Sequence, residues 1–320
     1  MTEPVERFLE SHPQAAQAWV EAMARVVGRV MLLPGLSRWL PLAQRVHALA
    51  RPTESGTVLD KPGAAPPPAR EWLTVASANL WHDWPRQHRW SDRLESVARL
   101  VEAESIDILL LQEIARTRRL EADRWLAGRL GMSVAYARAN GAVDAIGFEE
   151  GLAVLSRYPI GCVHLRQLSR SRNPLVRRIA LGAEVMTPHG VVLAVTTHLG
   201  LVRKHNARQV SALREWVAAI TGGEVAVIGG DFNAPETSAE MTITSGEWTD
   251  TFRRANPRAS SSTYASRAPW GRWTRPRLLD YVFVQQPIGH HWQVADSHHV
   301  DAPGGQHSDH RAVVTRLVPG

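Results

Sequence analysis

The stretch VAVIGGDFN, residues 225–233, is a short apolar run that ends in two glycines and two polar side chains. Such a run, bounded by turn-forming residues, is typical of a strand buried on both faces of a sheet. It follows NARQVSALREWVAAITGG (206–223), which has apolar residues at helical spacing and stops at a glycine pair. Before that lies VVLAVTTHL (191–199), an apolar run that ends at His198. Together these segments predict a strand, helix, strand unit.

The first half of the chain contains the same kind of unit. LTVASANLW (73–81) predicts a strand that ends at Asn79. SDRLESVARLVEAESI (91–106) has helical spacing, and DILLLQE (107–113) predicts a buried strand that ends at Glu113. The two halves therefore resemble copies of one supersecondary unit.

The spacing of the polar strand ends supports an internal repeat. Asn79 and Glu113 are 34 residues apart, and His198 and Asp231 are 33 residues apart. Each half also continues into a further predicted strand: GLAVLSRYPI in the first and LLDYVFV in the second. Two such halves can bury their free sheet faces against each other. We therefore predict an α/β fold, a four-layer α/β/β/α sandwich of two mixed sheets flanked by helices. A single doubly wound parallel sheet is the alternative, but no glycine-rich nucleotide fingerprint supports it.

Composition and charge indicate a globular protein that suits a phosphorylated partner. With 44% hydrophobic and 21% charged residues, the chain can bury a substantial core. The net charge of +6 comes almost wholly from arginine, since Lys61 and Lys204 are the only lysines. Arginine binds phosphate through a planar fork, although this bias can also reflect base composition. The single cysteine, Cys162, excludes an internal disulfide and a cysteine-rich zinc site, and its strand-like context predicts a small core residue.

Three regions are predicted along the chain. Residues 1–50 have helix-like apolar spacing and form an N-terminal helical extension. Residues 51–70, rich in proline and glycine, form a linker, and residues 71–320 form the main domain. The extension could pack on the main domain, dock a partner or lie on a membrane, and packing is favoured. Since no uninterrupted apolar run of membrane-spanning length occurs, we expect a soluble, cytoplasmic protein without a transmembrane segment.

Polar side chains stand at the ends of the predicted strands, and a sandwich of this kind gathers them at one edge. They are Asn79, Glu113, His198, Asp231, Asn233, Asp280, Asp309 and His310. Carboxylate and amide oxygens are hard ligands suited to Mg²⁺ or Mn²⁺. A zinc site would need more histidine or sulfur donors at short spacing, and HExxH does not occur. Singly, each residue is explained by a turn or a cap, but jointly they indicate a catalytic site.

Seven sequence blocks, in this order, make the resemblance specific: SANLW, LLLQE, GLAVLSR, TTHL, GDFN, LLDYVFV and SDHRAVV. The chain resembles the endonuclease/exonuclease/phosphatase superfamily over residues 72–318. That group includes DNases, AP endonucleases, neutral sphingomyelinases and inositol polyphosphate 5-phosphatases. The resemblance implies the four-layer sandwich already predicted, a catalytic domain at residues 71–320, and phosphoester hydrolysis that depends on Mg²⁺ or Mn²⁺.

The resemblance implies a metal-binding role for three of the residues. Glu113, in the QE block, would be the principal ligand, with Asn79 close to it. Asp309 would support the same metal or occupy a second metal position.

The resemblance implies catalytic roles for the other five. Asp231 and Asn233 would position or deprotonate the attacking water and hold a phosphate oxygen. Asp280 would pair with His310, which would donate to the phosphate or serve as the general base. His198 would contact a nonbridging oxygen or help protonate the leaving group. Water would attack phosphorus in line, without a covalent enzyme intermediate.

Several further features leave two interpretations open. Glu150 lies near the substrate or is a solvated loop carboxylate. By resemblance to the family, Arg208 and Gln209 would open the helix after TTHL and could support the site from behind. The run LRQLSRSRNPLVRR (165–178) binds a phosphate backbone or, as we favour, is a solvated hairpin. Tryptophans in loop-like positions stack bases, contact lipid or, most simply, pack on the sandwich; they are Trp81, Trp84, Trp90, Trp270 and Trp273.

The substrate stays open at the level of sequence. Net positive charge and loop tryptophans favour a nuclease or general phosphodiesterase. The helical extension would also suit a sphingomyelinase-like enzyme that cleaves lipid head groups, and a noncatalytic binding module is a third, disfavoured hypothesis. The chain has LQEIA where AP endonucleases carry LQETK, which argues against abasic-site repair, and inositol phosphatase signatures are not evident. Nucleic acid and a lipid surface are therefore candidate partners, and no oligomeric state is predicted.

Overall fold

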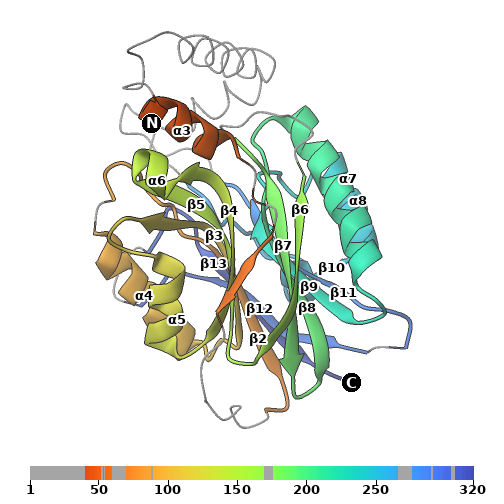
Figure 1. The fold of residues 1–320 in the computed structure, drawn as a ribbon. Helices are drawn as coiled ribbons and strands as arrows, with labels where there is room; N and C mark the ends of the chain where they lie inside the picture. The colour runs from red at the N-terminus through yellow and green to blue at the C-terminus, as the bar shows by residue number, and fades with distance from the viewer. Residues whose placement is uncertain are drawn as a thin grey trace.

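Two mixed β-sheets pack face to face, and helices cover the outer face of each (Figure 1). The structure is a computed structural model that describes residues 40–51, 53, 55–59, 70–87, 89–168, 176–265, 276–289, 291–303 and 307–320. The predicted four-layer sandwich is confirmed, and the alternative of one doubly wound sheet is wrong. Of the predicted N-terminal helical extension, only α3 (Leu40–Ala50) lies within the described residues.

The first sheet has seven strands in the order β1-β4-β5-β3-β2-β13-β12. These are β1 (Thr57–Leu59), β2 (Leu73–Asn79), β3 (Ile108–Thr117), β4 (Ser133–Ala142), β5 (Phe148–Ser156), β12 (Gln293–Val300) and β13 (Ala312–Val318). The second sheet has six strands in the order β10-β11-β9-β8-β7-β6. These are β6 (Ile160–Gln167), β7 (Ile179–Thr187), β8 (Gly190–His198), β9 (Val225–Asp231), β10 (Thr249–Asp250) and β11 (Asp280–Gln285).

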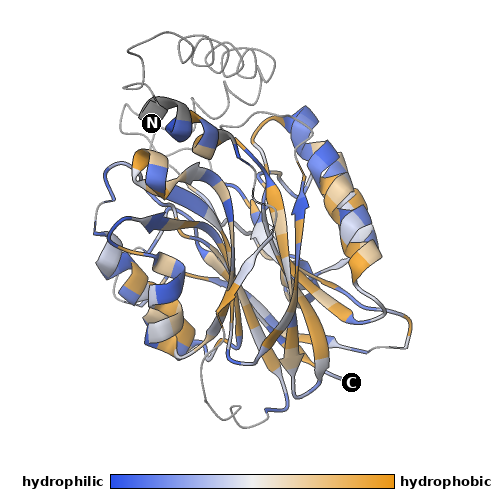
Figure 2. Cartoon of the chain, viewed as in Figure 1, coloured by the Kyte–Doolittle hydropathy of each residue, from blue (hydrophilic) through white to orange (hydrophobic). Residues whose placement is uncertain are grey.

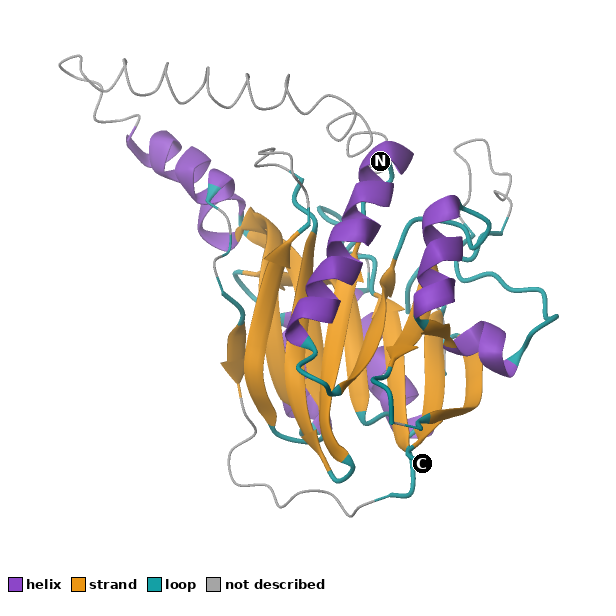
Figure 3. Ribbon diagram, turned by 90° about the vertical axis from the view of Figure 1, so that its right-hand side faces the viewer, coloured by secondary structure: helices purple, strands orange, loops and turns teal. Residues whose placement is uncertain are grey.

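Helices α4 (Trp90–Ala103) and α5 (Ala122–Leu130) pack on the first sheet, and α7 (Arg203–Ile220) and α8 (Ala239–Glu247) on the second (Figures 1 and 3). The short helix α6 (Val143–Ile146) leads into strand β5. The short helix α9 (Thr251–Ala255) follows strand β10. No described helix is both long enough and apolar enough to cross a bilayer.

The internal repeat is present in the strand pairing. Strands β2 and β3 are parallel and joined by α4, and β8 and β9 are parallel and joined by α7. The register is equivalent, because Asn79 pairs with Gln112 and His198 pairs with Asp231. Strand β5 then adds antiparallel to β3, and β11 adds antiparallel to β9. The last residues of equivalent strands therefore reach the same end of the sandwich.

Strands at the centre of both sheets are buried on both faces, which explains their continuous apolar sequences. In β9, Val225 and Val227 enter the core between the sheets, whereas Ala226 and Ile228 pack under α7 and α8. Figure 2 shows the same contrast, with mostly hydrophobic strands and helices that are polar on their outer side. Full burial of such side chains contributes about 1.5–3 kcal/mol each.

Two glycines of β9 allow the backbone to approach its neighbours closely. A Cβ on Gly229 would lie 2.7 Å from Leu110 Cδ1 and 2.9 Å from Ser77 Cβ, which belong to the opposite sheet. A Cβ on Gly230 would overlap the carbonyl oxygen of Thr197 in the adjacent strand β8. The glycine pair before Asp231 therefore sets the spacing of two strands and two sheets at the position where β9 ends.

The helix α3 is attached to the sandwich through its last turn. It contacts β4 and α6, and two arginines donate to the carbonyl groups at its C-terminal end. Arg138 donates to the carbonyls of Ala48 and Arg51, and Arg177 donates to that of Leu49. These donors satisfy carbonyls that a helix end leaves without partners. For the described part of the extension, packing on the main domain is therefore the arrangement found.

Two smaller expectations differ from the structure. The segment 51–70, expected as a linker, contains the edge strand β1, which pairs antiparallel with β4. Cys162 was expected in the core but is exposed on β6, because that strand lies at the edge of the second sheet.

We predict that Gly230→Ala lowers the free energy of unfolding by about 2–4 kcal/mol, because the added methyl group forces β8 and β9 apart. Urea denaturation followed by circular dichroism measures the change. Gly246→Ala is the matched control: its Cβ meets no atom within 4 Å, and it lies in α8, where alanine favours the helix. Equal stability of the two variants would contradict the proposed strand spacing.

Candidate active site

Polar side chains from both sheets meet where β2, β8 and β9 end. Strand β11 runs antiparallel to β9, so its first residue, Asp280, pairs with the last residue of β9, Asp231. The segment before β13 brings Asp309 and His310 to the same end. Hydrogen bonds, close charge pairs or electrostatic interactions link all eight residues that the sequence singled out.

Glu113 reaches this group because β3 contains a bulge. The register between β3 and β5 shifts between Leu111 and Ile114, and Glu113 has a φ of 52°. A positive φ is unfavourable for a residue with a side chain, and such strain concentrates at functional sites. Asn79 Nδ2 donates to Glu113 Oε1 at 3.2 Å, and the backbone N–H of His82 donates to Oε2 at 3.2 Å. The strained backbone therefore holds the carboxylate in a defined orientation.

Asn79 connects the carboxylates of the two sheets. Its Nδ2 also donates to Asp231 Oδ2 at 3.1 Å, while its Oδ1 accepts the N–H of Trp81 at 2.9 Å. In this arrangement the amide nitrogen faces Glu113 and Asp231, so Asn79 orients both carboxylates.

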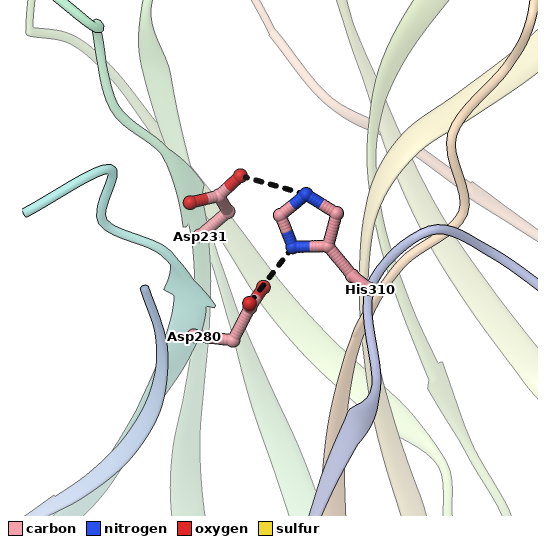
Figure 4. A group of neighbouring side chains, drawn as sticks. All are labelled: Asp231, Asp280 and His310. Atoms are coloured by element: carbon pink, nitrogen blue, oxygen red, sulfur yellow. Dashed lines mark hydrogen bonds and ion pairs between the residues drawn. The ribbon is translucent and has the colours of Figure 1, made fainter. Parts of the chain in front are cut away.

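The side chains of Asp231, His310 and Asp280 form a connected series of ionisable groups (Figure 4). His310 Nδ1 lies 2.8 Å from Asp280 Oδ2, and Nε2 lies 3.8 Å from Asp231 Oδ2. Burial alone would lower the pKa of His310, but the fields of Asp280 and Asp231 and the hydrogen bond to Asp280 raise it to about 10. Burial and the neighbouring Asp280 raise the pKa of Asp231. The imidazole is therefore protonated at neutral pH and presents an N–H toward Asp231.

His198 and Asn233 complete the side of the site formed by the second sheet. His198 Nε2 lies 3.7 Å from Asp231 Oδ2, and burial followed by the field of Arg178 lowers the His198 pKa well below 6.5. This second imidazole is therefore neutral. Asn233, with a φ of 49°, donates its backbone N–H to Asp231 Oδ1 at 2.9 Å and its side-chain amide to the carbonyl of Leu199.

The charges on the first-sheet side fit a hard cation. Although burial opposes it, the neighbouring imidazoles of His82 and His310 and the hydrogen bond from Asn79 lower the pKa of Glu113 to about 2, so this carboxylate is ionised. Burial, together with the charge of Glu113, raises the pKa of Asp309 to about 6. Carboxylate oxygens are hard ligands suited to Mg²⁺ or Mn²⁺, so Glu113 and Asp309 are candidate ligands.

A second group of potential ligands lies around Asp231. One atom each of Asp231, Asp280 and His310 lie within 4.8 Å of one another. His310 can offer a ring nitrogen to a metal only when that nitrogen carries no proton. The carboxylates of Glu113 and Asp309 and this second group are therefore two places at which the described residues could hold a cation.

Two neighbours of the site were either missed or left open by the sequence patterns. His82 is buried, lies 3.6 Å from Glu113 Oε2 and accepts the N–H of Trp84 at Nδ1. Glu150 is not a solvated loop residue; it lies in β5, accepts a hydrogen bond from Asn140, and burial raises its pKa to about 6. Trp81 and Trp84 are exposed near the same strand end.

Arg93 is a further residue that sequence patterns did not reveal. It lies in α4, which begins at Trp90, yet its side chain is buried beneath the site. Its guanidinium donates to the backbone carbonyls of His307, Leu80 and Trp81. Arg93 therefore ties the segment before β13, which carries Asp309, to the loop that follows Asn79.

The residues expected behind the site divide into two groups. Gln209 is buried and accepts the N–H of Gly200, and its neighbour Asn206 donates to the carbonyls of Gly200 and Phe232. Arg208 is exposed, and α7 begins at Arg203, so Arg208 does not open the helix.

The arginine run and the remaining tryptophans also differ from expectation. Strands β6 and β7 form the favoured hairpin, but Arg177 and Arg178 are buried in it rather than solvated. Arg166 is exposed, and Arg170, Arg172, Trp270 and Trp273 lie outside the described residues. Trp90 is buried at the start of α4.

Comparison with known proteins adds family information to this geometry. The model of the Endonuclease/Exonuclease/phosphatase family matches residues 76–310. The uncharacterized protein YbhP of Escherichia coli K12 is 32% identical over 142 residues, which are 40% of this chain and 54% of YbhP. The chain thus spans about half the length of this curated relative.

Two solved structures share the fold. Danio rerio TDP2, complexed with a single-strand DNA product, has a TM-score of 0.60 and 14% identity, over 78% of this chain and 99% of that one. The mannosyl-6-phosphatase of Bacteroides thetaiotaomicron has a TM-score of 0.57 and 20% identity, over 77% and 99%. At these identities the similarity concerns the fold alone.

We predict that Glu113→Gln weakens binding of Mn²⁺ and Mg²⁺ at least tenfold, because it removes the ionised ligand. Calorimetric titration measures the affinity, and thermal unfolding gives a second readout, since a ligand at 100 times its Kd stabilises the folded state by about 2.7 kcal/mol. Glu184→Gln is the matched control, because Glu184 also lies in a strand and pairs with an imidazole, that of His164, at 2.9 Å. Equal affinities of both variants would remove Glu113 from the cation site.

Proposed function

The chain belongs to the endonuclease/exonuclease/phosphatase family, and on that premise we propose that it is a divalent-metal-dependent phosphodiesterase, acting as a nuclease or general phosphodiester hydrolase. The proposal rests on one observation: the side chains of Asp280, His310 and Asp231 are linked in series beside the ionised Glu113. In this proposal His310 supplies a positive charge, Asp231 accepts a proton and Glu113 binds the cation. Each of these components promotes hydrolysis at phosphorus.

Each group has a role that its protonation state allows. The carboxylates of Glu113 and Asp309 would hold Mg²⁺ or Mn²⁺, which would neutralise charge on the phosphate oxygens. Asp231, which has a raised pKa and a fixed Oδ1, accepts a proton from the attacking water. His310, kept protonated by Asp280, donates from Nε2 to a nonbridging phosphate oxygen. In this proposal His310 therefore has an electrostatic role.

His198 and Asn233 act from the other side of the phosphate. The neutral imidazole of His198 offers one N–H to a phosphate oxygen without competing for the proton that Asp231 accepts. Asn233 fixes the loop after β9 through its bond to Leu199, and thereby fixes Asp231. A buried set of preorganised donors is the arrangement that stabilises charge developing in a transition state.

We expect Glu113→Gln, Asp231→Asn and His310→Gln each to lower kcat for bis(p-nitrophenyl) phosphate by about 10²- to 10⁴-fold, because each removes one charge that the transition state requires. The assay measures nitrophenol release with Mg²⁺, with Mn²⁺ and with EDTA. EDTA should abolish the activity of the wild type.

Variants on β6 and β7 serve as controls for these substitutions. Glu184→Gln and His164→Gln alter the same residue types in a carboxylate and imidazole pair away from the site, and should retain wild-type kcat. Activity that persists in EDTA, or that survives Glu113→Gln, would refute the proposal. Plasmid DNA, single-stranded RNA and sphingomyelin, assayed alongside, separate a nuclease from the lipid-specific alternative; release of choline phosphate alone would favour the latter.

A further inference from the structure

Two tryptophans in the loop after β2 stand exposed beside the candidate site. Trp81 and Trp84 each have 37% of their surface exposed, although tryptophan usually buries most of its ring. They alternate with residues that face inward: Leu80 is fully buried, and His82 packs against Glu113. The loop therefore presents two indole rings to solvent next to Glu113, which lies at the bulge of β3.

The rings have fixed positions. Trp84 stacks on Phe148, with ring centroids 5.1 Å apart and an interplanar angle of 24°. The guanidinium of Arg93 lies 5.0 Å from the centroid of the Trp81 ring. An aromatic side chain held in this way offers a flat surface without a further loss of rotamer freedom on binding.

The backbone of the loop is held as firmly as its rings. The N–H of Trp81 donates to Asn79 Oδ1, that of His82 to Glu113 Oε2, and that of Trp84 to His82 Nδ1. Two of these bonds end on predicted site residues, so the position of the rings is coupled to the position of the carboxylate.

The loop also carries conformational strain. Trp81 and Asp83 have φ angles of 45° and 46°, in the left-handed region that residues with side chains rarely adopt. Glu113 and Asn233 share this feature, at 52° and 49°. Strain of this kind persists where the surroundings enforce it, and it is concentrated at functional sites. The two exposed rings thus belong to the same strained region as the candidate catalytic residues.

We propose that Trp81 and Trp84 form a stacking platform for the nucleobases of a single-stranded nucleic acid whose phosphodiester lies at Glu113 and His310. The inference rests on the proposed function and narrows its substrate class. Bases stack on aromatic rings whatever their sequence, so the platform would select unpaired strands without reading their sequence.

The surroundings of the rings favour a polynucleotide over a lipid surface. The exposed Arg86 follows in the same loop and suits a phosphate backbone; Arg89, after it, is also exposed but pairs with Asp92 at 3.0 Å. The other large exposed apolar side chains of the described residues lie on other elements: Val58, Leu59, Ile146, Met186, Ile243 and Ile288. A membrane contact would instead require a contiguous apolar patch.

Binding of a fluorescein-labelled eight-residue oligothymidylate, measured by anisotropy in EDTA, tests the platform without any cleavage. The matched ligand is an abasic oligonucleotide of equal length, which keeps the phosphates and lacks the bases. The wild type should bind the oligothymidylate at least tenfold more tightly than the abasic strand. Trp81→Leu combined with Trp84→Leu should reduce this ratio to near one, whereas the double phenylalanine variant should keep most of it.

The controls distinguish base stacking from a general loss of binding and from lipid contact. Trp72→Leu should leave the ratio unchanged, because Trp72 lies at the opposite end of β2, beside Arg316. The stacking proposal is contradicted if the double leucine variant still prefers oligothymidylate over the abasic strand. It is also contradicted if the wild type binds both strands equally. Binding to phosphatidylglycerol vesicles that is lost in the leucine variants, with no preference for bases, would assign the rings to lipid instead.

The outcome for the proposed function is read separately. If bis(p-nitrophenyl) phosphate is hydrolysed but the base preference is missing, the phosphodiesterase stands and the platform falls. If the base preference is present but no phosphodiester is cleaved, the stacking platform stands and the phosphodiesterase proposal falls.

Discussion

The close approach of the two sheets at the end of β9 is the constraint on which the site depends. Gly229 leaves room for Ser77 and Leu110 of the opposite sheet. At the same level Gln112 Nε2 donates to Thr196 Oγ1 at 2.9 Å, which links β3 to β8 across the interface. Because the sheets are fixed to each other there, strand ends that lie far apart in sequence are held within reach of one another.

The electrostatics of the site follow from this geometry. Asp231 and Asp280 are adjacent in the strand pairing, so one protonated imidazole, that of His310, lies against both. The charge of Arg93 interacts favourably with Glu113 and Asp309, whereas the hydrogen bonds of its guanidinium go to backbone carbonyls. Buried carboxylates are stable only when paired or bound to a metal. The candidate site therefore combines buried carboxylates with a cationic partner on either side: His310 beside Asp231 and Asp280, and Arg93 near Glu113 and Asp309.

The sequence predicted those features that periodicity and repetition encode. The matching distances within the two halves placed Asn79 at an equivalent strand end, because parallel strands joined by one helix repeat their register. The sequence pattern did not reveal the bulge in β3. Gln112 pairs with Asn79, and Glu113 reaches the site only because the backbone adopts a positive φ at that residue. His82 lies in a loop whose path has no periodic signal. Arg93 lies in an amphipathic helix, where a charged residue is normally expected to face solvent.

The attachment of α3 bears on how this molecule can be divided. Arg138 and Arg177 donate to the last carbonyls of that helix, and the field of Arg138 contributes, after burial, to lowering the Arg177 pKa to about 10. Cutting the chain after residue 50 would remove the carbonyl acceptors of Ala48 and Leu49 from two guanidiniums that repel each other beside β4. Residues 40–51 thus supply hydrogen-bond acceptors for two arginines of the sandwich. An expression boundary placed at the proline-rich segment would leave these arginines with fewer acceptors.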